Sequence, residues 1–433
     1  MKPFFSPAAL PAIFGRGKIT PMKLFILIVV VLFSSCSKTT HREENPALQV
    51  QKPAPSAEPS ANNTQDSAPL ILGGKHYEGR VGDTVVINTI GMRDWIEAPR
   101  KCFLEDASLL IRVWFDIDPL DPNKMNNLEN IELLTNIKSL SILGKNLDGV
   151  DFSHLSALSS LEHLFIKGEH LGSVNFSFIS VLSNLEDLII EGNISRPPDL
   201  TSLEKLTSVA IIGSALESFD KLGAPNLNKM TIKMKTFDSL APLSNLTELE
   251  FLYIMAPRSK LVTIGNIKNV PKLKTLFLET SGTIDLTGIE HLTELADLRL
   301  GMEATPVNTQ GISNLRNLEL LEMFIIEDEN PSIEYLRGLP NLRYVSILSD
   351  TLIWNDETKE PYQILDVSPL GKSPKLQQLK IKGFIVKNVS ALNDLENLSY
   401  NSINLDGCRL LDETEAERST KWLIFDSSIL RDG

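Results

Sequence analysis

The apolar residues of the chain follow a spacing that neither a helix nor a half-buried strand produces. In "LSNLEDLII", residues 182–190, leucines recur every third residue and the last step shortens to two, at Ile190. An amphipathic helix needs steps of three and four, and a half-buried strand needs strict alternation. The pattern predicts a short strand in which Leu188 and Ile190 face inward while the residue between them points outward.

The same pattern, [S/T/P]-x-L-x-x-L-x-L, recurs along most of the chain. Successive copies follow one another at roughly the 20–29-residue period of leucine-rich repeats, with one longer separation between the tenth and the eleventh. One such unit cannot bury its apolar face alone, so we predict stacked copies that share a continuous core. The middle apolar residues of the twelve copies are Leu140, Leu164, Leu188, Val209, Met230, Leu249, Leu276, Leu298, Leu321, Val345, Leu379 and Leu398.

These copies resemble the bacterial leucine-rich repeats of internalin-like proteins, a class with repeats of roughly 22 residues. The resemblance covers about residues 110–405. It implies an α/β leucine-rich-repeat solenoid with a curved parallel β-sheet on its concave face, short helices, 3-10 turns and loops on its convex side, and a cap at each end. The family's asparagine, three residues after the last strand leucine, is present only at Asn193. The turns are therefore expected to be less uniform than in the family.

The segment before the repeats contains an apolar run that is too short to span a membrane. Residues 24–33 are ten apolar residues behind Lys23, whereas a spanning helix needs about 20. This length is typical of the central region of a signal peptide. The "SSC" that follows resembles a bacterial lipoprotein signal, in which the cysteine is acylated, so Cys36 is the predicted lipid attachment site. The alternative is an ordinary secretory signal with a chance cysteine.

After Cys36 the chain is rich in Pro, Ala, Ser and polar residues, a composition that cannot bury enough surface to fold. We read it as a tether. The predicted domains are a signal peptide at 1–35, with Met22 as a second candidate start; a lipidated, disordered tether at 36–70; an N-terminal cap at 71–109; a repeat domain of about 12–13 repeats at 110–405; and a C-terminal cap at 406–433.

Charge and motif content argue against several functions. The net charge of −13 disfavours binding to nucleic acid, because phosphate contact needs clustered Lys and Arg. His163 and His170 have no carboxylate or cysteine at ligand spacing, so no metal is predicted. The Gly-Gly-Lys segment at 73–75 lacks the phosphate-loop pattern, and no nucleophile motif is present. Cys102 and Cys408 flank the repeats, so we expect no disulfide between them. We predict no enzymatic activity and no cofactor.

The outward strand positions carry apolar residues where a sheet that only meets water would be polar. An apolar stripe with a polar surround is typical of a binding surface, and its aromatic residues are candidate anchors. The alternatives are that neighbouring side chains cover these residues, or that the register slips by one residue in a few repeats. The candidate partner-binding residues are Leu143, Phe165, Ile189, Ile212, Leu252, Phe277, Phe324 and Leu348.

A second candidate site lies in the long segment between the tenth and eleventh predicted strands. Val345 and Leu379, the middle residues of those strands, are separated by about twelve more residues than in a typical repeat, and the extra residues fall within 349–366. Long loops in compact architectures are usually functional or disordered. Trp354 and Tyr362 stand among acidic residues there and are candidate partner-contacting residues. The alternative is that Trp354 only covers the convex core.

A repeat solenoid supplies an extended surface for macromolecules, although a fold alone does not define a function. We expect a monomeric, membrane-anchored bacterial lipoprotein that binds a protein or glycan partner on its concave surface, adhesin-like by analogy with internalin-like proteins. Its lipid would attach it to the cell envelope at the outer membrane, on the surface or the periplasmic side. The alternative is a structural or assembly factor of the envelope that binds the cell's own proteins or peptidoglycan.

Overall fold

The computed structural model describes residues 70–72, 75–77, 112–116, 127–128, 131–133, 137–213, 221–265, 267–301, 304–325, 331–349, 363–398, 402–405 and 407–411. The chain divides into two compact units, Met1–Gln65 and Asp66–Gly433, and all described residues belong to the second. The signal segment, Cys36, Trp354 and Tyr362 lie outside the described residues, as do most residues of the two predicted caps.

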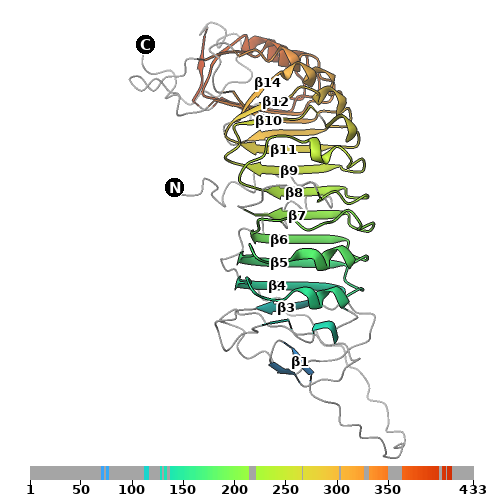
Figure 1. Ribbon diagram of the computed structural model, residues 1–433. Coiled ribbons are helices and arrows are strands. Elements are labelled where there is room, and N and C mark those ends of the chain that lie inside the picture. The colour runs from blue at the N-terminus through green and yellow to red at the C-terminus, as the bar shows by residue number, and fades with distance from the viewer. Residues whose placement is uncertain are drawn as a thin grey trace, which may run out of the picture. The chain divides into compact units, whose positions relative to one another are not determined.

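Parallel strands, stacked in chain order, form the main sheet (Figure 1). Each strand pairs in register with the strand one repeat away, so equivalent residues of successive repeats lie side by side. This confirms the predicted leucine-rich-repeat solenoid. Within the described residues the sheet has 13 strands: β3 Arg112–Asp116, β4 Ser139–Asn146, β5 His163–His170, β6 Asp187–Asn193, β7 Ser208–Ile212, β8 Lys229–Lys233, β9 Phe251–Ala256, β11 Thr275–Thr280, β13 Asp297–Gly301, β15 Leu320–Ile325, β16 Tyr344–Ser349, β18 Gln378–Lys382 and β20 Ile403–Asn404.

Short 3-10 helices lie between successive strands of the main sheet, as predicted for the return path. The leucines between strands recur every third residue, which matches the three residues per turn of a 3-10 helix, and the poorer hydrogen-bond geometry of such helices keeps them short. The described 3-10 helices are η2 Ile131–Leu133, η3 Ser153–Ala157, η4 Phe176–Val181, η5 Ala241–Leu243, η6 Ile267–Asn269, η7 Ile289–His291, η8 Thr309–Asn314, η9 Glu334–Leu336, η11 Ser368–Lys372 and η12 Val389–Leu392.

Additional small sheets form in the C-terminal half, where the sequence pattern did not predict them. Most of their strands bury the middle one of three residues, and these buried residues pair across neighbouring repeats, as Val262 does with Ile284. One sheet contains β10 Leu261–Thr263, β12 Thr283–Asp285 and β14 Thr305–Val307, and another contains β17 Ile364–Asp366, β19 Ile385–Lys387 and β21 Arg409–Leu410. A separate antiparallel hairpin joins β1 Leu70–Leu72 to β2 Lys75–Tyr77.

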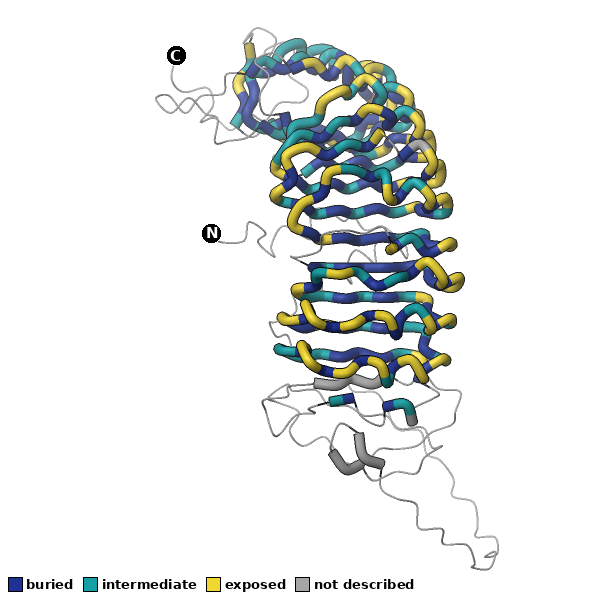
Figure 2. Tube along the Cα trace, in the orientation of Figure 1, coloured by how far each residue is buried: buried dark blue, intermediate teal, exposed yellow. Residues whose placement is uncertain are grey.

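The buried hydrophobic residues of the described ranges form one continuous core cluster. Buried positions recur from strand to strand along the repeats (Figure 2). In the third repeat, Leu182, Leu185, Leu188 and Ile190 are all fully buried, as their spacing predicts. Full burial of such a side chain contributes roughly 1.5–3 kcal/mol. Because every repeat adds an equivalent set, stability accumulates from neighbour to neighbour along the stack.

The strand of the sixth repeat lies one turn later than the sequence pattern predicts. Leu252, not Leu249, pairs with Met230 on β8 and with Leu276 on β11. Leucines recur every third residue through this segment, so "SNL" at 244–246 imitates the true motif one turn too early. The prediction that Leu252 points outward is therefore wrong, because its side chain is fully buried in the core. In this register, the number of residues from Met230 to Leu252 is nearly the same as the number from Leu252 to Leu276.

The last repeat is also displaced. Ile403 pairs with Leu379 on β18, so the strand lies beyond Leu398, which the pattern places at mid-strand. Leu398 is instead a buried residue that precedes the strand, and its N–H donates to the Leu395 carbonyl at 3.2 Å. The repeat that begins at Leu379 would be unusually short if it ended at Leu398, and it has an ordinary length when it ends at Ile403.

Asparagine side chains link the repeats, at a different place from the family's asparagine position. Each precedes the last buried leucine before a strand, and its amide donates to a backbone carbonyl of the preceding repeat. These hydrogen bonds satisfy carbonyls that the turns leave without a backbone partner. The pairs are Asn184 to Ser159 at 2.7 Å, Asn226 to Glu204 at 2.8 Å, Asn317 to Thr293 at 2.9 Å, Asn341 to Arg316 at 2.8 Å and Asn397 to Pro374 at 2.9 Å. We call this set the amide ladder.

Candidate partner-binding surface

The outward side of the main sheet carries the side chains that alternate with the core residues, and we call it the open face. The strand register arranges these side chains in rows across the sheet. The middle row holds the residue between the two core residues of each strand, for example Ile189 between Leu188 and Ile190. The exit row holds the residue after the second core residue, for example Glu191.

Seven of the eight predicted surface residues lie on the open face with half-buried side chains. They do not form one stripe, because they occupy two rows and charged residues separate them. Their role in binding stays a prediction. Phe165, Ile189 and Phe277 are in the middle row, whereas Leu143, Ile212, Phe324 and Leu348 are in the exit row. Among them, Phe165 lies beside Ile189, and Phe324 lies beside Leu348.

A stack of side chains in the middle row occupies the centre of the open face. Tyr253 on β9 and Phe277 on β11 stack with ring centroids 4.7 Å apart and an interplanar angle of 17°. On the other side of Phe277, the Arg299 guanidinium lies 6.0 Å from the ring centroid. Parallel stacking and cation–π contact each add roughly 0.5–1.5 kcal/mol beyond simple burial. We call Tyr253, Phe277, Arg299 and its partner Asp297 the aromatic centre.

Arg299 is held in place by Asp297 on the same strand. Arg299 Nε lies 2.9 Å from Asp297 Oδ1, and Arg299 Nη2 lies 2.9 Å from Asp297 Oδ2. Burial disfavours the charged guanidinium, but the hydrogen bonds and the charge of Asp297 outweigh it, so the pKa of Arg299 is raised. Such a two-point pair fixes orientation as well as charge. The guanidinium is therefore preorganised over Phe277.

Glu279, in the exit row of β11, is a partly desolvated carboxylate beside the aromatic centre. Burial raises the pKa of Glu279, opposed by a hydrogen bond from the Tyr253 hydroxyl and by the charge of Lys233. The charge of Glu322 on β15 raises it further. Burial and the neighbouring Glu279 also raise the pKa of Tyr253, so its hydroxyl remains protonated and acts as a donor.

The sequence pattern does not assign Tyr253 or its strand neighbours Phe251 and Met255 to the open face. The pattern centres the sixth strand on Leu249, one turn before its observed position at Leu252. Tyr253 and its neighbours therefore fall outside the outward positions that the pattern predicts. One signal could have found them. In sequence, Leu252 lies nearly midway between Met230 and Leu276, the equivalent residues of the neighbouring repeats. A strand centred on Leu249 would instead make the repeat before it short and the repeat after it long.

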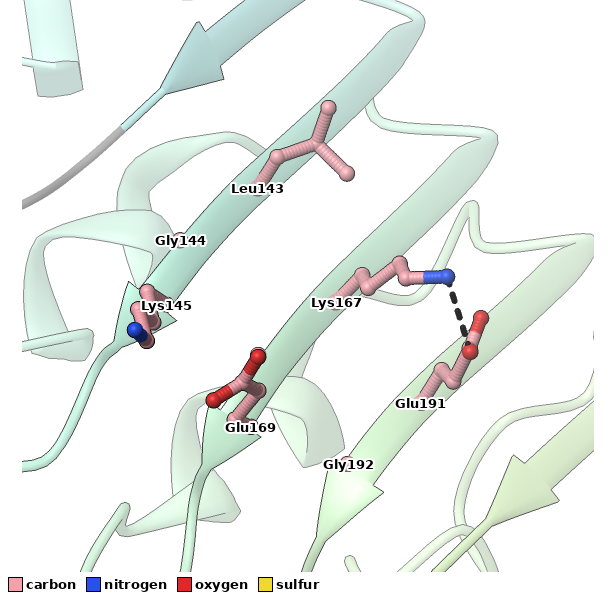
Figure 3. Close-up of a pocket in the computed structure, with 8 residues that line it drawn as sticks. Leu143, Gly144, Lys145, Lys167, Glu169, Glu191 and Gly192 are labelled. Carbon is pink, nitrogen blue, oxygen red and sulfur yellow. Dashed lines mark hydrogen bonds and ion pairs between the residues drawn. The ribbon is translucent and has the colours of Figure 1, made fainter. Parts of the chain in front are cut away.

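A shallow hollow lies where β4, β5 and β6 end (Figure 3). Gly144, Gly168 and Gly192 pair across these strands and line it. A Cβ on Gly192 would lie 1.9 Å from the Gly168 carbonyl oxygen, so only glycine permits this close approach. Lys167 and Glu191 extend toward one another across the rim, with Lys167 Nζ 2.8 Å from Glu191 Oε1. These two charges satisfy each other, and Lys145 and Glu169 also line the hollow.

His163 and the described cysteine, Cys408, have structural partners. His163 Nδ1 lies 2.8 Å from Asp187 Oδ2 on the next strand. The thiol of Cys408 is buried and donates to the Ile381 carbonyl at 3.4 Å. The described part of the chain contains no group of three or more His, Cys, Asp or Glu side chains that could hold a metal ion.

No helix in the described ranges is long and apolar enough to cross a membrane.

No protein-family model matches the chain, and no characterised protein matches it in sequence. Solved structures are similar to it in fold. An internalin (inlF) from Listeria monocytogenes is 21% identical, with a TM-score of 0.46 over 70% of this chain and 75% of that one. A leucine-rich-repeat protein from Leptospira interrogans is 18% identical, with a TM-score of 0.46 over 72% and 87%. TLR13, solved in complex with ssRNA13, is 19% identical, with a TM-score of 0.48 over 69% of this chain and 46% of that one.

Proposed function

We propose that this protein is a non-enzymatic binding protein that holds a macromolecular partner on the open face of its repeat sheet. The observation that carries the proposal is the aromatic centre. Tyr, Phe and Arg side chains stand preassembled on a face that water would otherwise keep polar. Tyr and Arg are enriched among residues that dominate binding energy, and rigid side chains lose little conformational entropy when a partner binds.

The partner is a protein or a glycan outside the cytoplasm. Support comes from the apolar run at 24–33, from Cys36 after it, and from the polar segment that could act as a tether. On this proposal the chain is a lipoprotein of the bacterial envelope, displayed at the outer membrane as an adhesin-like protein. The alternative is a periplasmic assembly factor. Protease treatment of intact cells separates the two, because a displayed protein is degraded and a periplasmic one is protected.

The binding proposal is tested by capturing partners on the full chain and comparing two variants. Phe277→Ala removes the middle member of the aromatic centre, and Phe165→Ala removes the same side chain from the same row, five strands away. Both residues are half-buried, so each truncation should cost about 1–2 kcal/mol of folding stability. A partner of the aromatic centre should bind Phe277→Ala at least about tenfold more weakly, a loss of roughly 1.4 kcal/mol or more.

Phe165→Ala should bind that partner normally. Equal binding by Phe277→Ala and the unmodified chain, with both folded, would show that the aromatic centre is not the site. Equal weakening by both variants would indicate a general loss of structure if circular dichroism with urea unfolding shows one, and a partner that contacts both Phe165 and Phe277 if both variants are folded.

A further inference from the structure

Arg299 has unused hydrogen-bonding capacity at the centre of the open face. Its two bonds to Asp297 occupy Nε and Nη2. The third guanidinium nitrogen, Nη1, has no hydrogen-bond partner in the part of the chain that the structure describes, and it is not shut off from solvent. The Arg299 side chain keeps 33% of its surface exposed. The N–H groups of Nη1 can therefore reach an acceptor on a partner.

The other polar groups of the aromatic centre are already engaged. Both carboxylate oxygens of Asp297 accept hydrogen bonds from Arg299, and the Tyr253 hydroxyl donates to Glu279. Among the described side chains of the aromatic centre, Arg299 Nη1 is thus the donor that remains. The two-point pair holds the guanidinium in one orientation before a partner arrives, so little conformational entropy is lost on binding.

The charges around Arg299 favour a neutral acceptor over an anionic one. Asp297 compensates the guanidinium charge, and Glu322 on β15 pairs in register with Arg299 and adds a second nearby anion. A carboxylate, sulfate or phosphate group would approach one cation that already has two anions beside it, and like charges at an interface cost binding energy. A carbonyl oxygen carries no net charge and avoids this repulsion.

The stack around Phe277 favours a polypeptide over a glycan. Tyr253 covers one side of the ring, with centroids 4.7 Å apart, and the Arg299 guanidinium lies over the ring from the next strand. Phe277 therefore lacks an open flat face on which a sugar ring could pack, and it presents its edge. The edge of an aromatic ring makes good contact with apolar and aromatic side chains.

One residue of an extended polypeptide can meet both parts of this surface. Each residue carries a carbonyl next to its side chain, and an extended residue spans about 3.3 Å. The Arg299 guanidinium carbon lies 6.0 Å from the Phe277 ring centroid. A side chain against the rings thus leaves a neighbouring carbonyl within reach of Nη1.

We propose that Arg299 is the polar anchor of the open face, and that its Nη1 donates a hydrogen bond to a main-chain carbonyl oxygen of a polypeptide partner. An apolar side chain beside that carbonyl packs on the edges of Tyr253 and Phe277. This inference rests on the proposed function, and it adds the chemical class of the partner and the group that the site recognises.

Short peptides selected by phage display against the immobilised full chain supply the probe. Counter-selection against Phe277→Ala removes peptides that bind elsewhere. The remaining peptides should contain an apolar residue that is required for binding, and no required Asp or Glu. Their affinity, measured by fluorescence anisotropy, should change little as salt rises, because a neutral acceptor is not screened.

A coupling measurement then locates the hydrogen bond. Synthetic copies of one peptide carry an (E)-alkene in place of one amide at a time, which keeps the shape of the main chain and removes the carbonyl. At one position the replacement should weaken binding to the unmodified chain at least about tenfold, as loss of a hydrogen bond to a charged group does. The same peptide should lose less than about twofold against Arg299→Lys, because that contact is already absent.

Matched variants separate this role from a structural one. Arg299→Lys keeps the positive charge beside Asp297 and loses the planar fork, and it should bind the unmodified peptide at least about tenfold more weakly. Arg337→Lys is the control, because Arg337 makes the same two-point pair, through Nε and Nη2, with Glu334 on η9, outside the main sheet. It should bind normally. If Arg299→Lys does not fold, the double variant Asp297→Asn, Arg299→Met replaces it.

Several results would overturn the inference. They are failure to select any peptide that depends on Phe277, equal losses by the alkene peptides against the unmodified chain and Arg299→Lys, and dependence on a peptide carboxylate with a steep loss of affinity in salt. On a glycan array, glycan binding that Arg299→Lys abolishes would also count against it. The proposed function has a separate test. If a captured partner depends on Phe277 but binds Arg299→Lys normally, the open face is the binding site and only the carbonyl assignment fails.

Discussion

Leu252 and Tyr253 are adjacent in sequence but lie on opposite sides of β9. Leu252 is fully buried between its counterparts on β8 and β11, whereas Tyr253 is half-buried on the open face. A shift of one residue exchanges the two faces of a strand, so register decides which side chain stabilises the fold and which can meet a partner. The difference has a measurable consequence.

Leu252→Ala should lower the free energy of unfolding by about 2–5 kcal/mol, because it leaves a cavity in a packed core. Tyr253→Ala should cost clearly less, since its side chain keeps one side toward solvent. Urea unfolding followed by circular dichroism compares them under one condition. If Tyr253→Ala proves the more destabilising of the two, the register described for β9 is incorrect.

Glu279 should make stability depend on pH in a defined direction. Burial is the main cause that raises its pKa above the ordinary value, so its folded-state pKa exceeds its unfolded-state pKa. Ionisation of Glu279 therefore destabilises the folded state. This cost is absent at a pH below the unfolded-state pKa of Glu279 and fully present above its folded-state pKa. Glu279→Gln should therefore raise the unfolding midpoint near pH 7, and this gain should shrink as the pH falls toward about 4. A gain that is the same at every pH would show that ionisation of Glu279 is not its source.

At the scale of elements, the amide ladder connects five of the repeats to the repeat before them, at the entry to the strands. Asn226→Ala removes one such hydrogen bond, to the Glu204 carbonyl, and should cost about 0.5–1.5 kcal/mol. Asn341→Ala should cost more, because Asn341 also accepts a hydrogen bond from Lys375 at 2.6 Å. Thermal unfolding of the variants measures both effects.

Asn245 provides the control for the ladder. It occurs in the same "SNL" letters as Asn184, but one turn earlier in its repeat, and its side chain is exposed. Asn245→Ala should leave the unfolding temperature nearly unchanged. A loss equal to that of Asn226→Ala would mean that asparagine acts at these positions through local turn preference and not through links between repeats.

At the scale of the whole molecule, the repeats form one continuous core, while the proposed attachment to a membrane depends on Cys36. Cys36→Ser should abolish incorporation of labelled fatty acid and leave the protein unprocessed or unlipidated. One acyl chain binds a membrane only weakly, so stable anchoring needs additional chains or contacts. Fatty acid incorporation that persists in Cys36→Ser would rule out this attachment site. The repeat domain should fold equally well in the unmodified protein and in Cys36→Ser, because its core lies entirely within the solenoid.

The sequence alone determined the class of fold and most of the core. Leucine steps of three followed by a step of two identify a strand with its turn, and their recurrence identifies a solenoid. This pattern correctly assigned the inward residues in every copy except the sixth and the last, for example Leu188 and Ile190. It also placed Phe165, Ile189 and Phe277 outward, because alternation on a strand follows directly once the core residues are known.

Only the tertiary structure decided the register of the sixth and last repeats and the arrangement of the candidate site. Where leucines recur every third residue for several turns, each leucine fits the motif equally well, and pairing with the neighbouring strands selects Leu252. The stack of Tyr253, Phe277 and Arg299 comes from the strands of three successive repeats. Sequence spacing does not specify which side chains of different repeats become neighbours. That follows from the cross-strand register, because packing of the shared core brings the three side chains into contact.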